Sequence, residues 1–170
     1  NSYAMQGNSR IGAKIKADTI NAKFELAAKP GIALRKIYAT WNFGMGELLI
    51  GQTDPVVDFW ESNQIWGGDN DLGGFGAVGA GRTPQFRITT KVNNGTLMVA
   101  AIPPSTDVAG ATGTADIDVI LPKLEAAYHM DIDNIGLDGF LGLQYYSIDT
   151  AAKNYNVTSI ITGVNAHIDM

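Results

Sequence analysis

The sequence lacks cysteine altogether, which excludes disulfides, thiol nucleophiles and thiolate metal sites. It also has few basic residues, 12 against 17 acidic ones, and the net charge of −5 argues against a nucleic-acid partner. Long apolar runs are missing, because none approaches the ~18 residues that a membrane-spanning helix needs. Charged residues make up only 17% of the chain, whereas a soluble domain normally covers its surface with more of them. The composition therefore suggests that part of the chain faces something other than water.

Alternation of apolar and polar residues with a period of two is the main pattern present, and it predicts β-strands. In the first such segment, Arg10 and Lys14 alternate with Ile11 and Ile15. Strands are predicted over about nine ranges, 8–17, 20–26, 34–43, 47–52, 85–92, 96–102, 119–131, 136–148 and 156–169. Turn signals such as Asn93-Asn94-Gly95 separate them, and no segment predicts a helix.

Two all-β folds fit this pattern. A soluble β-sandwich has alternating strands, but its polar face meets water and normally carries more charge. Here one face of the strands is apolar with almost no exceptions, and the opposite face holds most of the lysine and arginine. An antiparallel transmembrane β-barrel, with lipid outside and water inside, requires that arrangement. The pattern favours the barrel and leaves the sandwich as the alternative.

Two parts of the chain resemble strands of the Gram-negative general porins. Residues 8–14 (NSRIGAK) and 21–26 (NAKFEL) are similar to the second and third porin strands. Residues 35–52, RKIYATWNFGMGELLIGQ, are similar to the next porin hairpin, including its Phe43-Gly44 turn. The resemblance implies a barrel of about 16 to 18 strands, for which this chain has roughly half the required length. We therefore expect residues 1–170 to be a fragment, a partial porin-type barrel domain with about nine strands.

The same resemblance implies a function and partners. It implies a passive, water-filled diffusion channel for small hydrophilic solutes and ions in the bacterial outer membrane. It implies a homotrimer surrounded by outer-membrane lipid and lipopolysaccharide, with no reaction, no catalytic residue and no cofactor. Two alternatives stay open: a substrate-selective channel with a binding track of Tyr38, Trp60, Trp66 and Arg87, or a soluble β-sandwich binding module.

A glycine-rich stretch, GGDNDLGGFGAVGAGR at 67–82, contains the G-x-G-x-x-G spacing of dinucleotide loops at 74–79. A dinucleotide loop follows a strand and opens a helix, whereas this stretch is followed by a predicted strand. In the porin interpretation, residues 54–83 are instead a long loop that folds into the barrel and narrows the pore. An external loop fits the composition nearly as well, although Trp60 and Trp66 favour packing against the wall.

Charges on this loop and on the strands have opposite signs. Acidic residues of the loop are Asp54, Asp58, Glu61, Asp69 and Asp71. The predicted basic wall, on the polar faces of the strands, comprises Arg10, Lys14, Lys16, Lys23, Lys36, Arg87 and Lys91. Such an arrangement predicts a transverse field that selects among solutes. Each basic residue taken alone is better explained as part of a solvated polar face, so the prediction depends on the set.

Metal sites are weakly indicated. Asp69 and Asp71 begin like a calcium-binding loop, but the later glutamate and the flanking helices are missing. His129, Asp131 and Asp133 alternate at a strand end, yet two histidines without a third nearby ligand are more typical of ordinary polar-face residues. The sequence therefore predicts no metal.

Overall fold

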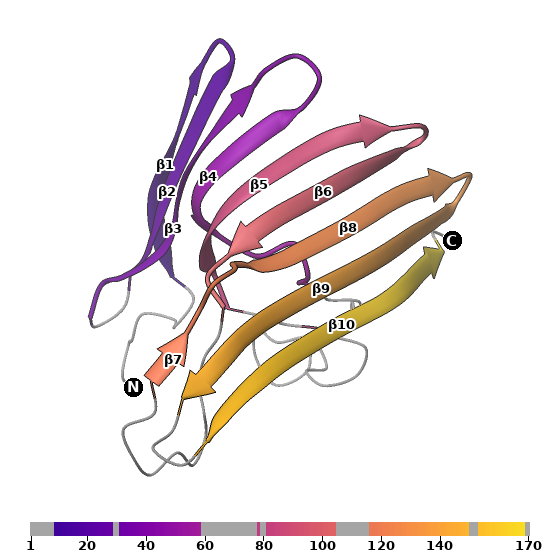
Figure 1. The fold of residues 1–170 in the computed structure, drawn as a ribbon. Helices are drawn as coiled ribbons and strands as arrows, with labels where there is room; N and C mark the ends of the chain where they lie inside the picture. Colours follow the sequence, from indigo (N-terminus) through magenta and orange to yellow (C-terminus); the bar gives the residue numbers. More distant parts are fainter. Residues whose placement is uncertain are drawn as a thin grey trace, which may run out of the picture.

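The computed structural model describes residues 9–28, 31–58, 78, 81–104, 116–149 and 153–168. These residues form one antiparallel sheet of ten strands, and no helix occurs among them (Figure 1). The strands are β1 (Arg10–Ala17), β2 (Ile20–Ala27), β3 (Ala33–Asn42), β4 (Glu47–Thr53), β5 (Thr83–Val92), β6 (Gly95–Ile102), β7 (Asp116–Asp118), β8 (Lys123–Ile132), β9 (Ile135–Asp149) and β10 (Asn154–Ile168). The all-β antiparallel prediction is confirmed. Within the described ranges, no helix is long and apolar enough to cross a membrane.

The strands follow one another in chain order across the sheet, except that the short β7 pairs with the far end of β9. Short turns join β1 to β2, β3 to β4, β5 to β6 and β8 to β9, all at the same end of the sheet (Figure 1). Three of these turns contain a non-glycine residue with a positive φ, namely Asp18, Asn93 and Asp133, and the turn from β3 to β4 contains Gly44 with a φ of 93°. Asp and Asn tolerate that conformation better than other residues with a Cβ, which explains the turn signals of the sequence.

The strand predicted over 119–131 is wrong at its beginning. Residues 119–122 belong to no strand, and β8 begins only at Lys123. Pro122 precedes it, and proline has no backbone N–H to donate to a neighbouring strand. The upstream residues Asp116–Asp118 instead pair separately with residues 147–149 of β9.

The strand register gives the sheet one apolar and one polar face. On the apolar face, Ile88 pairs with Leu48 on one side and Val99 on the other, and this pattern continues across the sheet. Large side chains on this face are exposed to an unusual extent, including Ile15 at 62% and Phe86 at 63%. Among the described residues there is no second sheet to cover them, as a β-sandwich would require.

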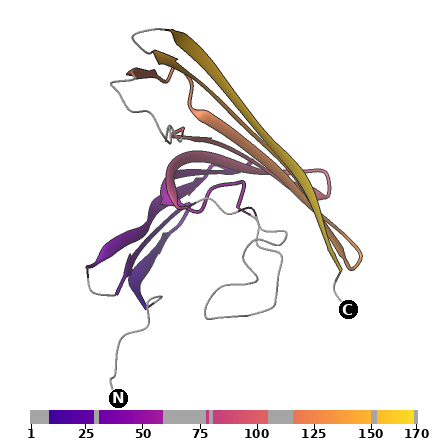
Figure 2. The same cartoon turned by 90° about the horizontal axis from the view of Figure 1, so that it is seen from below.

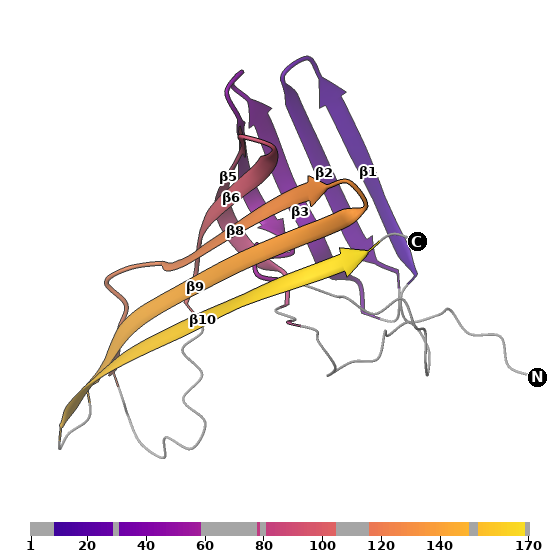
Figure 3. The same cartoon turned by 90° about the vertical axis from the view of Figure 1, so that its right-hand side faces the viewer.

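The sheet is strongly bent and twisted. Figure 2 shows β1–β3 and β8–β10 as two arms, with β4–β6 at the bend between them. Figure 3 shows that β1 and β2 run at a large angle to β9 and β10, because the twist accumulates from strand to strand. Among the described strands, β1 and β10 are the two edges and do not pair with each other.

Aromatic side chains gather near the short turns on the apolar face. The rings of Trp41 and Phe43 lie 5.8 Å apart. The Tyr128 ring lies over Gly95, where any Cβ would collide with it, and its hydroxyl donates to the Val92 carbonyl at 2.9 Å. Amphipathic rings in this position are typical of the interface between a membrane and water.

Candidate functional site

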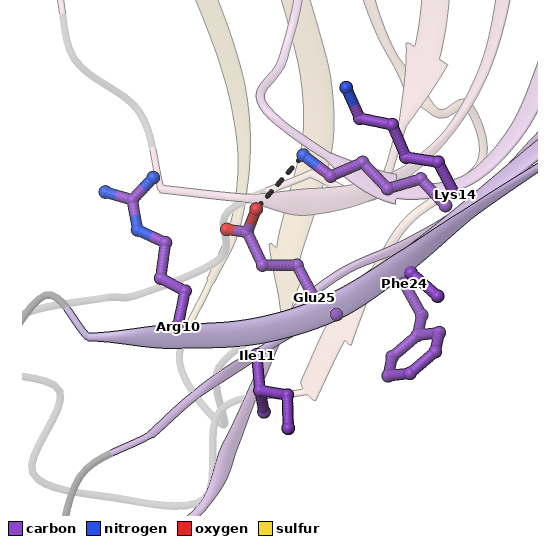
Figure 4. Close-up of a pocket in the computed structure, with 8 residues that line it drawn as sticks. Arg10, Ile11, Lys14, Phe24 and Glu25 are labelled. Atoms are coloured by element: carbon purple, nitrogen blue, oxygen red, sulfur yellow. Dashed lines mark ion pairs between the residues drawn. The ribbon is translucent and has the colours of Figure 1, made fainter.

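The polar face of the sheet is the candidate site. The register places all seven residues of the predicted basic wall on this face. Residues that pair in register lie on the same face of a sheet, and the pairs from β1 to β6 connect all seven. Figure 4 shows the separation on β1 and β2: Arg10, Lys14 and Glu25 project to one side, whereas Ile11 and Phe24 project to the other. Because side chains alternate along a strand, the face of each residue follows from its parity in the sequence, except where the register between β2 and β3 shifts at Glu25 and Leu26.

Several of these basic residues have a hydrogen-bond or ion-pair partner on the same face. Glu25 on β2 accepts a hydrogen bond from Arg35 Nε at 2.8 Å and pairs with Lys23 Nζ at 3.0 Å. Figure 4 marks the ion pair between Glu25 and the neighbouring lysine. At the other end of the basic wall, Lys91 Nζ donates to Thr96 Oγ1 at 2.6 Å. The polar face therefore carries ion pairs and hydrogen bonds between neighbouring side chains as well as an excess of basic residues.

Asp54 lies directly after β4 and contacts two basic residues. Its carboxylate pairs with Lys36 and, at 3.3 Å, with Arg82 Nε. Gln85, which is buried, donates its side-chain amide to the backbone carbonyl of Asp54 at 2.9 Å and to that of Thr53 at 3.3 Å. Both described ends of the loop between β4 and β5 are thus fixed at the same place on the polar face.

Residues 54–58 turn onto the polar face and pack there. Val56 and Val57 are buried at 5% and 3% exposure, and Val56 forms a cluster with Ala100, Ile102 and Ala127. Figure 2 shows this segment on the inner side of the bend. The polar face is therefore the concave one, and the chain that leaves β4 follows its surface.

Arg87 lies near the middle of β5, with Leu49 and Ala100 as its register partners. Glu47 and Tyr38 lie on the same face, as the register partners of Thr89 and Lys23. Its Nε is buried, and within the part of the chain that the structure describes it makes no hydrogen bond.

A second polar cluster lies near the short turns. The His129 ring contacts Asp138 Oδ1 through Nδ1 at 2.7 Å and Asp131 Oδ1 through Nε2 at 3.3 Å. The ring of His167 stacks on that of His129, with centroids 6.5 Å apart. No group of three or more side chains suited to a metal ion is found in the described ranges.

The remaining predicted site residues lie mostly outside the described part of the chain. Asp58 is described and is the last residue of the segment 54–58. Those outside are Glu61, Asp69 and Asp71 of the acidic loop, including both weak calcium candidates, and the aromatic residues Trp60 and Trp66. The acidic loop opposite a basic wall therefore remains a prediction beyond Asp54, which contacts that wall directly.

Several charged residues of the site were not predicted, including Glu25, Arg35, Arg82 and Glu125. A sequence signal was available for the two glutamates, since Lys23-Phe24-Glu25 and Lys123-Leu124-Glu125 share a Lys-x-Glu spacing. Residues i and i+2 of a strand lie on the same face, so this spacing places opposite charges side by side. Both pairs are formed, at 3.0 and 2.8 Å.

No protein-family model and no curated protein matches this chain. The crystal structure of the outer membrane channel DcaP of Acinetobacter baumannii is similar to it, with a TM-score of 0.68 and 19% sequence identity. The similarity covers 93% of this chain and 47% of that channel, so the chain spans about half of that protein. The predicted fold is confirmed: the sheet resembles part of the barrel of an outer-membrane channel.

Proposed function

We propose that this chain forms part of the wall of an outer-membrane pore, a passive, water-filled channel for small hydrophilic solutes and ions. One observation supports this above the others: a single curved sheet exposes large apolar side chains on its convex face and places paired charges on its concave face. Lipid contact on one side and water on the other accounts for both faces at once. The protein has no catalytic role in this proposal, and it assembles as a trimer in the outer membrane.

Single-channel recording of the native protein in a planar bilayer tests the proposal. Stepwise openings in groups of three are expected, with conductance that rises in proportion to salt concentration. A folded sample that produces no openings would contradict the channel, and openings that occur only singly would contradict the trimer. Folding is checked independently by the heat-sensitive gel mobility of the barrel.

Removing two charges from the basic wall is expected to change ion selectivity. A unit charge about 8 Å from an ion in water contributes ~0.5 kcal/mol, and salt reduces this further. Arg87→Ala combined with Lys91→Ala should therefore shift the permeability ratio toward cations by roughly two- to fourfold. The reversal potential in a salt gradient measures this shift.

The matched control keeps both charges and alters only their shape. Arg87→Lys combined with Lys91→Arg should leave the reversal potential at the wild-type value. A double alanine variant with unchanged selectivity would remove the basic wall from the mechanism.

A substrate-selective channel is the second candidate, and the environment of Arg87 is the observation that favours it. The planar guanidinium of Arg87 is half-buried on the concave face, and such a group binds carboxylate or phosphate oxygens in a bidentate manner. Tyr38 lies on the same face, as the register partner of Lys23. Selective transport predicts that one solute saturates and blocks the ion current, whereas a general pore shows no saturation.

A further inference from the structure

Glu125 is the most deeply buried charged residue of the described chain. It lies on the polar face of β8, and its side chain is 0% exposed; among the described residues, Oε2 accepts a hydrogen bond, whereas Oε1 has an ion-pair partner but no hydrogen bond. Oε1 pairs with Lys123 Nζ at 2.8 Å, and Oε2 accepts a hydrogen bond from the Val57 backbone N–H at 2.9 Å. A glutamate on a water-facing sheet surface is normally exposed. The burial of Glu125 therefore requires another segment of the chain to cover it.

The cover is the segment that follows β4. Burial of a carboxylate is costly unless the charge is paired and hydrogen-bonded, and Glu125 satisfies both conditions. Lys123 comes from the same strand and would be present whatever lies above it. Val57 comes from 68 positions away and reaches Glu125 only because residues 54–58 lie on the wall.

The surroundings of Glu125 are shaped to receive this segment. Its register partners are Ala100 on β6 and Gly142 on β9, and Ala127 follows it on the same face. These small residues leave space beside the carboxylate, and Val56 packs against Ala100 and Ala127. Gln85 and Lys36 hold the backbone and side chain of residue 54, and Glu125 bonds the backbone farther along the segment, at Val57.

We propose that Glu125 is a positioning residue, which holds the start of the loop between β4 and β5 on the pore wall and thereby determines the free width of the pore there. This inference rests on the proposed channel function and deepens it. Lys123 neutralises the carboxylate, so the contact adds no net charge to the polar face. The pair thus positions the loop without altering the ion selectivity of the pore.

Glu125→Ala tests this proposal with two independent measurements on the native protein. Hydrogen exchange of the Val57 amide should accelerate by at least about tenfold, because its buried acceptor is lost. In a planar bilayer, the variant should show raised open-channel current noise and a shifted mean conductance, and the released Lys123 charge should shift the reversal potential toward anion selectivity. Asp131→Ala is the matched control, since Asp131 lies on the same face of β8 but its side chain is 70% exposed and its carboxylate contacts His129 at 3.3 Å.

Glu125→Gln separates the hydrogen bond from the charge. Its amide oxygen can still accept from Val57, so slow exchange and quiet openings should be restored, whereas the released Lys123 charge should shift selectivity toward anions. If the Val57 amide in Glu125→Ala exchanges at the wild-type rate, and the open-channel noise and mean conductance also equal those of the wild type, the proposal is overturned. If Glu125→Ala does not fold, the wild-type protein still decides, because a Val57 amide that exchanges as fast as a free peptide also overturns it.

The two measurements also separate this inference from the channel function. Accelerated exchange of the Val57 amide in Glu125→Ala, together with a wild-type protein that does not conduct, would support the positioning role of Glu125 and reject the pore. Normal wild-type conduction, with Val57 amide exchange and current noise in Glu125→Ala equal to those of the wild type, would reject the positioning role of Glu125 and leave the pore intact.

Discussion

Ile88→Arg is expected to destabilise the folded protein in lipid by about 2–4 kcal/mol, the typical cost of a cation at the bilayer midplane of a barrel. Ile88 lies near the middle of β5 on the apolar face, where its side chain is 49% exposed. Its register partners, Leu48 and Val99, offer no countercharge. The arginine would therefore enter hydrocarbon without a partner. Urea titration of the protein folded in lipid vesicles measures the difference.

Thr89→Arg is the matched control, because the adjacent residue points to the opposite face. There Glu47 is the register partner of Thr89 and supplies a countercharge in water. This variant should retain a free energy of unfolding within about 1 kcal/mol of the wild type. Equal stability of the Ile88 and Thr89 variants would contradict the assignment of the apolar face to lipid, since exposed sites in water tolerate arginine equally well.

Gly51→Ala is expected to destabilise the protein by about 2–5 kcal/mol, the sum of a left-handed backbone and an overpacked site. Gly51 has a φ of +131°, a conformation that residues with a Cβ rarely adopt. An added Cβ would lie 2.6 Å from Tyr38 Cα and even closer to the Ile37 carbonyl oxygen. Both neighbours are backbone atoms of β3 and cannot move without breaking the pairing of β3 with β4.

Gly139→Ala is the comparison for that effect. Gly139 lies in β9, and an added Cβ would have no other atom within 4 Å. Its substitution should be neutral or stabilise the protein by about 0.4–1 kcal/mol, because alanine restricts the unfolded chain. The fraction folded against urea concentration measures both variants. Equal midpoints for the two would show that β4 relaxes around residue 51, contrary to our expectation.

The pairing of charges changes how selectivity can arise on this wall. A simple count of lysine and arginine overstates the field in the pore, because Glu25 pairs with Lys23 and Arg35, and Lys36 pairs with Asp54. Among the described residues, neither Arg87 nor Lys91 forms an ion pair with a carboxylate, and Lys91 donates to the uncharged Thr96 hydroxyl. The double substitution of Arg87 and Lys91 therefore tests the part of the wall whose contribution depends least on ion pairs.

Much of the architecture follows from local sequence alone. Alternation with a period of two determined both the strands and the face of each side chain, because successive residues of a strand point to opposite sides. Asn93 and Asp18 marked their turns, since their side chains tolerate a positive φ. Even the late start of β8 had a local cause in Pro122, although alternation alone extended that strand too far.

Long-range contacts could not be predicted in this way. Alternation placed Glu125 on the polar face, but its burial depends on Val57, and nothing near either residue indicates the other. The strain at Gly51 likewise depends on the backbone of a neighbouring strand. Local rules act over a few residues and determine which face a side chain occupies. The register and curvature of the assembled sheet decide which distant groups come into contact on that face. These long-range contacts make the polar face a candidate pore wall.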